Sequence, residues 1–140
     1  MADETVTLGF VCVQNAGRSQ MATAFAERER ARRGLEGSVQ LLTGGTDPAE
    51  EVHPVVVDAM AEVGVDISDR EPRRITSEDL SAATVVATMG CSTLELDESI
   101  TVRDWALADP HGESIDVVRG IRDEVRARTS ALFDEYATEF

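Results

Sequence analysis

The residues best suited to chemistry lie in one short stretch near the start of the chain. Cys12 is followed after five residues by Arg18, and Ser19 comes directly after the arginine. A cysteine thiolate is a nucleophile, and a guanidinium presents a planar, permanently charged fork to two oxygens of an anion. This combination predicts a nucleophilic site that binds a tetrahedral oxyanion.

The surroundings of this stretch indicate how it would bind an anion. Residues 5–13 are apolar and β-branched, which predicts a buried strand, and residues 18–33 have helical spacing. Amides in a loop between a strand and a helix can turn inward as an anion nest, and the helix N-terminus adds positive potential. The predicted oxyanion-binding residues are therefore Val13, Gln14, Asn15, Ala16, Gly17, Arg18 and Ser19.

Three members of the loop have more specific expected roles. The positive field favours the thiolate form of Cys12, and Ser19 can donate a hydrogen bond to its sulfur. Asn15 can hold the loop in shape through bonds from its side chain to the backbone. A buried cysteine followed by a turn and a surface arginine is the alternative. The strand, loop and helix context favours the site.

The rest of the chain predicts an α/β domain with a parallel sheet. Further strands are expected over residues 39–43, 84–89 and 100–105, and further helices over 54–64 and after Ser114. No repeat or linker divides the sequence, so one domain over residues 1–140 is expected. Ligands of parallel sheets bind beyond the carboxyl ends of the strands. Cys12, Cys91 and Asp109 each follow a predicted strand and can meet at that edge.

Composition limits the partners and the compartment. The formal net charge is −14, which disfavours nucleic acid and anionic membranes as partners, and no apolar run is long enough to span a membrane. The first residues are acidic rather than basic, so a cytoplasmic location is expected. All 13 cationic side chains are arginine, and this acidic, lysine-free composition suggests a protein of a high-salt cytoplasm.

Other common kinds of site are disfavoured by the same sequence. The two cysteines do not form a disulfide scaffold, and the cysteines and histidines lack zinc-binding spacing, so no metal is expected. A Walker-type phosphate loop needs a lysine, and this chain contains none. His53 and His111 are interpreted as structural or surface residues, and residues 76–79 as the start of a short helical turn.

The stretch from Phe10 to Ala22, FVCVQNAGRSQMA, resembles the signature of the low-molecular-weight protein tyrosine phosphatase superfamily, most closely its arsenate reductase branch. Further similarities follow in order along nearly the whole chain: Gly45-Thr46-Asp47-Pro48, Val52-His53-Pro54, residues 60–68, Thr88-Met89-Gly90-Cys91, and Trp105 ahead of Asp109-Pro110. The resemblance implies a three-layer α/β/α fold with a four-stranded parallel sheet, and reduction of arsenate to arsenite through an adduct on Cys12.

The resemblance also implies roles outside the loop. Asp109 matches the general acid of the family, and Cys91 matches the cysteine that resolves the cysteine–arsenic adduct. Some relatives carry a third cysteine shortly afterwards, and here residues 92–96 contain none. The implied reductant is external, either a thioredoxin-like protein or a small thiol with a glutaredoxin-like protein, and no bound cofactor is expected. The two routes stay open.

A phosphatase acting on phosphotyrosine is the main alternative, because the loop and Asp109 serve both reactions. Phosphatases of this superfamily have aromatic residues around the cleft, often after the Asp-Pro pair. Here His111 follows Pro110, and the whole chain has one Trp, one Tyr and four Phe. A binding protein that senses oxyanions without turnover is a third class, disfavoured because cysteine, arginine and acid are all present.

Overall fold

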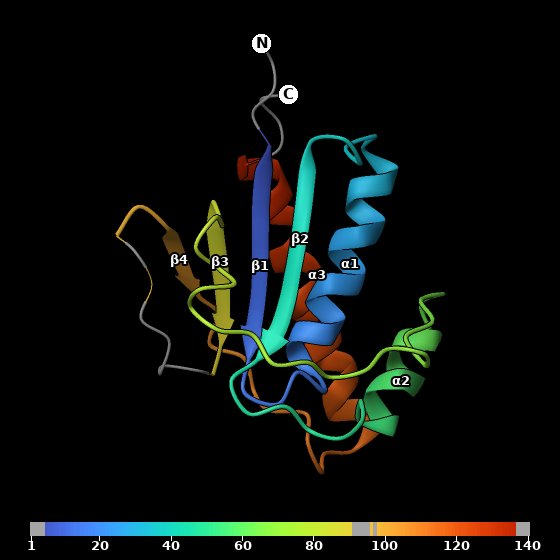
Figure 1. Cartoon of the computed structure of the whole chain (residues 1–140). Coiled ribbons are helices and arrows are strands. Elements are labelled where there is room, and N and C mark those ends of the chain that lie inside the picture. Colours follow the sequence, from blue (N-terminus) through green and yellow to red (C-terminus); the bar gives the residue numbers. More distant parts are fainter. Residues whose placement is uncertain (1–4, 91–95, 97, 137–140) are drawn as a thin grey trace.

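A four-stranded parallel sheet forms the centre of the molecule, in a computed structural model that describes residues 5–90, 96 and 98–136. The strands are β1 (Val6–Cys12), β2 (Val39–Gly45), β3 (Val85–Met89) and β4 (Thr101–Asp104). Their spatial order is β2-β1-β3-β4, and every neighbouring pair is parallel. Figure 1 shows that the strands end at one common edge of the sheet.

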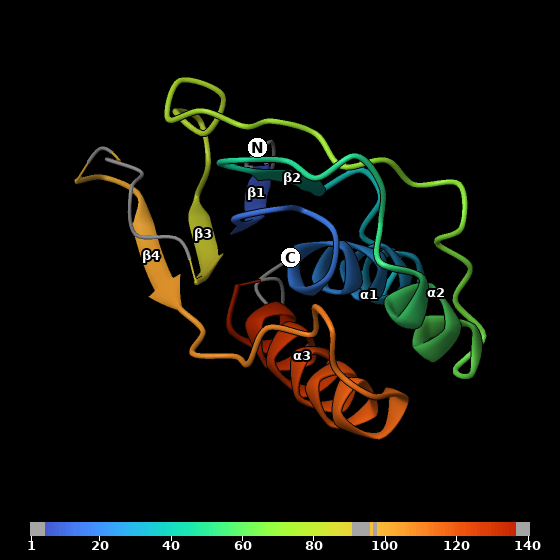
Figure 2. The same cartoon turned by 90° about the horizontal axis from the view of Figure 1, so that it is seen from below.

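Three helices cover one face of this sheet: α1 (Arg18–Arg32), α2 (Pro54–Ala61) and α3 (Ile115–Tyr136). Alternate residues of β1, including Leu8 and Phe10, meet apolar residues of all three helices in one core. In α3, Val118, Ile121 and Val125 recur at helical spacing and are buried. Figure 2, seen from below, shows these helices on a single side of the sheet.

The opposite face of the sheet is covered by the segment between α2 and β3 (Figure 2). Ile75 and Leu80 from this segment pack with Val11 of β1 and Val86 of β3 in a second core. The segment contains a helical turn, in which the Leu80 amide donates to the Thr76 carbonyl at 3.2 Å. The expected turn at residues 76–79 is therefore present, and the layer is otherwise irregular.

The predicted α/β class and the four-stranded parallel sheet are confirmed. The largest difference in a boundary is in the second helix, which ends at Ala61, and residues 62–64 form the turn that leaves it. Gly64 has φ +80°, and the Val65 amide donates back to the Met60 carbonyl at 3.0 Å, which closes the helix end. Within the described residues, no helix is long and apolar enough to cross a membrane.

Strand register fixes what lies around Cys12. Its partners across the sheet are Gly45 on β2 and Met89 on β3, so three strands end at the same level. The loop into α1, the segment after β2 and the turn after β3 therefore begin side by side. The elements alone bring together segments that are far apart in the sequence.

Candidate active site

The loop from Cys12 to Arg18 turns its carbonyl groups away from its inner side. The carbonyls of Cys12, Val13, Gln14 and Ala16 accept hydrogen bonds at 3.2, 2.8, 3.0 and 3.0 Å from the amides of Thr46, Asp47, Ala49 and His53, respectively. In a trans peptide the N–H points opposite to the C=O. The amides that follow these carbonyls therefore point inward, as an anion nest requires.

The sulfur of Cys12 lies in this loop with two polar neighbours. Its side chain is buried, the Asn15 amide donates to Sγ at 3.1 Å, and the Ser19 hydroxyl lies 2.9 Å from Sγ. Ser19 Oγ accepts a hydrogen bond from Asn15 Nδ2 at 2.6 Å, which leaves its own hydrogen to be donated to the sulfur. Both contacts stabilise a thiolate.

Asn15 fixes the shape of the loop. It is fully buried and has φ +53°, a left-handed conformation that few residue types other than glycine and asparagine adopt. Its Nδ2 also donates to Thr43 Oγ1 at 3.1 Å, and its Oδ1 accepts from the Arg73 amide at 3.0 Å and from Gln20 Nε2 at 3.1 Å. Asn15 thus bonds side chains and backbone from β2, α1 and the segment before β3.

The N-terminus of α1 faces the same loop. Gly17 is its N-cap, no side chain caps the helix, and its first turn contains no acidic residue. The first amides of a helix carry partial positive charge and seek an acceptor. A Cβ at Gly17 would lie 2.7 Å from Pro110 Cγ, so glycine permits the segment after β4 to approach the loop.

Arg18 is buried at the start of α1 and is held from two sides. Its Nη1 donates to the Leu107 carbonyl at 3.2 Å, and its Nη2 lies 3.9 Å from Asp109 Oδ2. Gly90, directly after β3, has φ +83°, and a Cβ there would lie 2.7 Å from Arg18 Nη1. The guanidinium is therefore enclosed by the turn after β3 and the segment after β4.

Asp109 lies beside Arg18, with its side chain 58% exposed. Its Oδ1 accepts a hydrogen bond at 3.0 Å from the amide of His111, which orients the carboxyl group. The sequence predicted that Cys12, Cys91 and Asp109 would meet at one edge of the sheet, and Cys12 and Asp109 lie there, with Arg18 beside Asp109. Cys91 lies outside the described residues, and its predicted position is not tested.

The two histidines, interpreted from the sequence as structural or surface residues, lie next to the loop and to the acid. The rings of His53 and His111 stack with centroids 4.7 Å apart. Burial lowers the pKa of His53, His111 lowers it further, and Asp109 raises it. The only sequence signal was position, since His111 follows Asp109-Pro110 and His53 precedes Pro54. The contact between the two rings depends on the fold, because the two histidines are far apart in the sequence.

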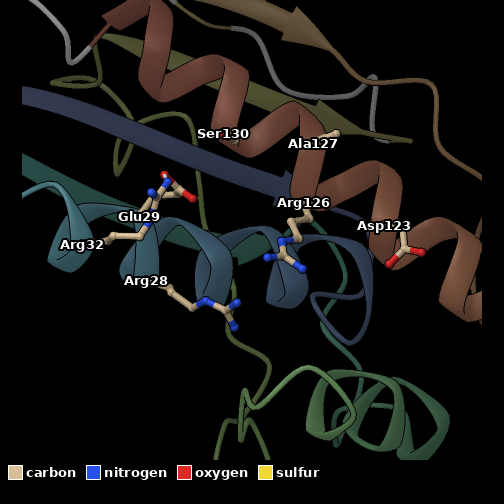
Figure 3. A pocket seen from close by; sticks show the side chains of 7 residues that line it. All are labelled: Arg28, Glu29, Arg32, Asp123, Arg126, Ala127 and Ser130. Atoms are coloured by element: carbon tan, nitrogen blue, oxygen red, sulfur yellow. Dashed lines mark hydrogen bonds and ion pairs between the residues drawn. The ribbon is translucent and has the colours of Figure 1, made fainter.

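A groove of about 500 Å³ lies elsewhere, between α1 and α3 (Figure 3). Its lining residues are Arg28, Glu29, Arg32, Asp123, Arg126, Ala127 and Ser130, none of which belongs to the loop. Three of its charges are already paired, since Arg32 contacts Glu29 at 2.6 Å and Asp123 contacts Arg122 at 2.9 Å. Among the described residues, no group of three His, Cys, Asp or Glu side chains could hold a metal ion.

The fold and loop match a known family. The family described as low molecular weight phosphotyrosine protein phosphatase matches residues 7–139, and the chain belongs to this family. A Halobacterium salinarum protein named "Putative arsenate reductase" is 60% identical over 136 residues, which cover 96% of each chain.

Two more relatives connect the chain with named reductases. The glutaredoxin arsenate reductase of a Synechocystis species is 35% identical over 127 residues, covering 88% of this chain and 92% of that protein. The solved thioredoxin-dependent arsenate reductase of Corynebacterium glutamicum superposes with a TM-score of 0.81 at 31% identity. That match covers all of this chain and 66% of the other, so this chain spans about two thirds of that protein's length.

Proposed function

We propose that this protein reduces arsenate to arsenite and that the reaction takes place on Cys12. The observation that carries the proposal is the loop itself, in which inward amides, the N-terminus of α1 and Arg18 surround a buried sulfur. Arsenate has the shape and charge for which such a loop is suited. The names of the relatives described above support the same activity.

In the first step, the Cys12 thiolate attacks arsenic. The loop amides and Arg18 bind the arsenate oxygens, and Ser19 and the Asn15 amide hold the sulfur in line. A sulfur–arsenic bond forms, the bond from arsenic to one of its hydroxyl groups breaks, and Asp109 gives its proton to the departing hydroxyl, which leaves as water. Arsenic remains in the +5 state in this adduct.

In the second step, another thiolate attacks the sulfur of Cys12. A sulfur–sulfur bond forms as the sulfur–arsenic bond breaks, and its electron pair stays on arsenic, which leaves as arsenite. The resolving thiol is Cys91 or a small external thiol. Cys91 follows Gly90, where a Cβ would lie 2.7 Å from Arg18 Nη1, and this sequence position supports Cys91. Absence of a third cysteine in residues 92–96 favours the external thiol.

The route determines the protein that restores the enzyme. A Cys12–Cys91 disulfide would be reduced by a thioredoxin-like protein, and a mixed disulfide with a small thiol by a glutaredoxin-like protein. Replacing Cys91 with serine distinguishes the two routes. Loss of turnover with thioredoxin indicates the internal disulfide, and full turnover with a small thiol excludes an obligatory internal disulfide. No bound cofactor is needed, because the thiols supply both electrons.

Phosphatase activity is the second candidate, since the same loop and acid would cleave a phosphate ester. One observation disfavours an aromatic substrate as the main one. The residue after Asp109-Pro110 is His111, and its ring is stacked on His53. The fold therefore offers imidazoles in place of the phenol and indole rings expected around a phosphotyrosine cleft. Slow hydrolysis of small aryl phosphates is still expected.

Two assays on one preparation test the proposal. Arsenite release from arsenate with dithiothreitol is measured beside hydrolysis of an aryl phosphate, in molar salt. We expect rapid arsenite formation and slow hydrolysis, with both absent in Cys12→Ser. Rapid hydrolysis without arsenite formation above the rate of dithiothreitol alone would instead assign the protein as a phosphatase.

We further propose that the protein works as a single domain in a high-salt cytoplasm, free of nucleic acid and membranes. Support comes from the charge of −14 and the absence of lysine. Screening by salt would reduce repulsion among the carboxylates. The expected result is that thermal stability rises steadily from low to molar salt, and equal stability at both would contradict this habitat.

A further inference from the structure

The stack of His53 and His111 joins two parts of the site. His53 is the last residue before α2, and its amide donates to the Ala16 carbonyl of the loop at 3.0 Å. His111 lies in the segment after β4, and its amide donates to Asp109 Oδ1 at 3.0 Å. The rings meet with centroids 4.7 Å apart and planes inclined by 22°. One histidine is therefore tied to the oxyanion loop and the other to the acid.

Buried side chains anchor the segment that leads to Asp109, since Trp105 and Leu107 pack in the main core. Arg18 donates to Leu107, and Pro110 lies against Gly17. The Asp109 side chain itself is more than half exposed, and its oxygen lies as far as 3.9 Å from Arg18. Solvent weakens an ion pair of that length. Those contacts fix the backbone of the segment, and the histidine stack adds a contact directly beside the exposed carboxyl group.

The stack depends on the protonation of its two rings. Neutral imidazoles stack readily, and a single proton is tolerated beside Asp109, but two imidazolium rings repel each other. The neighbouring charged groups are Asp109 and Arg18, with Glu51 and Glu113 each two residues along the chain from one histidine. Burial and His111 lower the pKa of His53, and Asp109 opposes both effects.

We propose that His53 and His111 are positioning residues, whose stacked rings hold Asp109 beside the oxyanion loop. This inference rests on the role of Asp109 as general acid in the proposed function. Its consequence is that loss of the stack slows the proton-donating step and leaves oxyanion binding unchanged.

The first test uses no substrate. The chain has two histidines, so NMR can follow the titration of each imidazole ring separately in the intact protein. Because His111 lowers and Asp109 raises the pKa of His53, the midpoint for His53 should rise in His111→Phe and fall in Asp109→Asn. A midpoint that is unchanged in both variants would overturn the proposed contact between the stack and the acid.

The second test uses the need for a proton. In hydrolysis of phenyl phosphate, Cys12 attacks phosphorus and the phenolate oxygen must take a proton from Asp109, whereas dinitrophenolate leaves without one. We expect His111→Ala to lower kcat/KM for phenyl phosphate about tenfold, which is less than the full rate enhancement that a general acid contributes. The value of kcat/KM for 2,4-dinitrophenyl phosphate should change little. The His111→Phe variant, whose ring can still stack on His53, should keep most of the rate on phenyl phosphate.

Two results would contradict the proposal. One is an equal loss on both esters, which indicates general damage to the loop. The other is equal impairment of His111→Phe and His111→Ala, which shows that stacking has no part. Failure of the proposed function is recognised separately, because these readouts contain no arsenate. Asp109→Asn must show the same preference between the esters if Asp109 is the acid.

Discussion

The two ends of α1 both carry arginine, in contrasting surroundings. At its N-terminus, Arg18 is buried and is enclosed by Gly90 and the segment carrying Leu107 and Asp109. In its last turns, Arg28 and Arg32 line the groove shared with α3, where Figure 3 shows Arg126 extending toward α1. The arginines of the groove lie among carboxylates, on helices and not beside a loop of inward amides.

The two ends of α1 differ in the features that bind an anion. The positive end of the helix dipole lies at Arg18, and the groove lies toward the negative end. The loop adds backbone amides whose direction is fixed by four outward carbonyl bonds. Fixed donors act without reorganisation, whereas exposed arginines are solvated and screened. The number of arginines at a site therefore does not predict whether it binds an anion, and the direction of the surrounding backbone amides does.

The largest effect is expected from Cys12→Ser. Both arsenate reduction and aryl phosphate hydrolysis should fall by on the order of a thousandfold or more, because the nucleophile is lost. Binding of inorganic phosphate, measured by calorimetry, should persist, since the amides and Arg18 remain. Loss of phosphate binding together with activity would indicate that the sulfur supports the loop as well as the chemistry.

The next prediction compares the two ends of α1 directly. Arg18→Lys should lower kcat/KM for arsenate about a hundredfold, because lysine lacks the planar fork that donates to two oxygens. The matched change Arg126→Lys in the groove should alter kcat/KM by less than about twofold. Equal effects, or a larger one at Arg126, would place the anion site in the groove.

A smaller effect is expected from Asn15→Ala. The variant loses bonds to Ser19 and Thr43 and must keep a left-handed backbone, which together should lower the free energy of unfolding by about 2–3 kcal/mol. Asn15→Gly permits the backbone conformation and loses only the bonds, so it should be less destabilised. Chemical denaturation measures both, and equal stabilities would show that the backbone conformation costs little.

The smallest effect concerns pH. Burial lowers the pKa of His53 below its ordinary value of 6.5, so the unfolded chain binds more protons in the window just below 6.5. The free energy of unfolding should therefore decrease as pH falls through that window and should be restored as pH rises. In His53→Gln this part of the pH dependence should disappear, and denaturation curves that keep the same slope would assign it to other groups.

Much of the site could be predicted from local sequence. The loop lies between a strand and a helix within eight residues, so its chemistry is determined by neighbours in the chain. The same holds for Gly17 and Ser19. The turn at residues 76–79 is also local, since Thr76 and Asp79 cap each other through bonds of 2.9 and 3.2 Å.

What escaped prediction depends on long-range packing. Thr43 and the Arg73 amide reach Asn15 only because β2 and the segment before β3 meet the loop. The stack of His53 on His111 requires two segments to meet at the end of the sheet. Gly90 directly follows the predicted strand 84–89, and its close approach to Arg18 follows from the neighbouring strands β1 and β3. No pattern within one short stretch of sequence predicts these contacts between distant segments.

The most direct test of the account is a single-turnover measurement of arsenite from arsenate by the fully reduced protein, with inorganic phosphate added as a competitor. The account predicts arsenite in proportion to the concentration of Cys12, suppressed by phosphate and absent in Cys12→Ser, once a thiol is present to resolve the adduct. Arsenite formation that is insensitive to phosphate, or unchanged in Cys12→Ser, would contradict it.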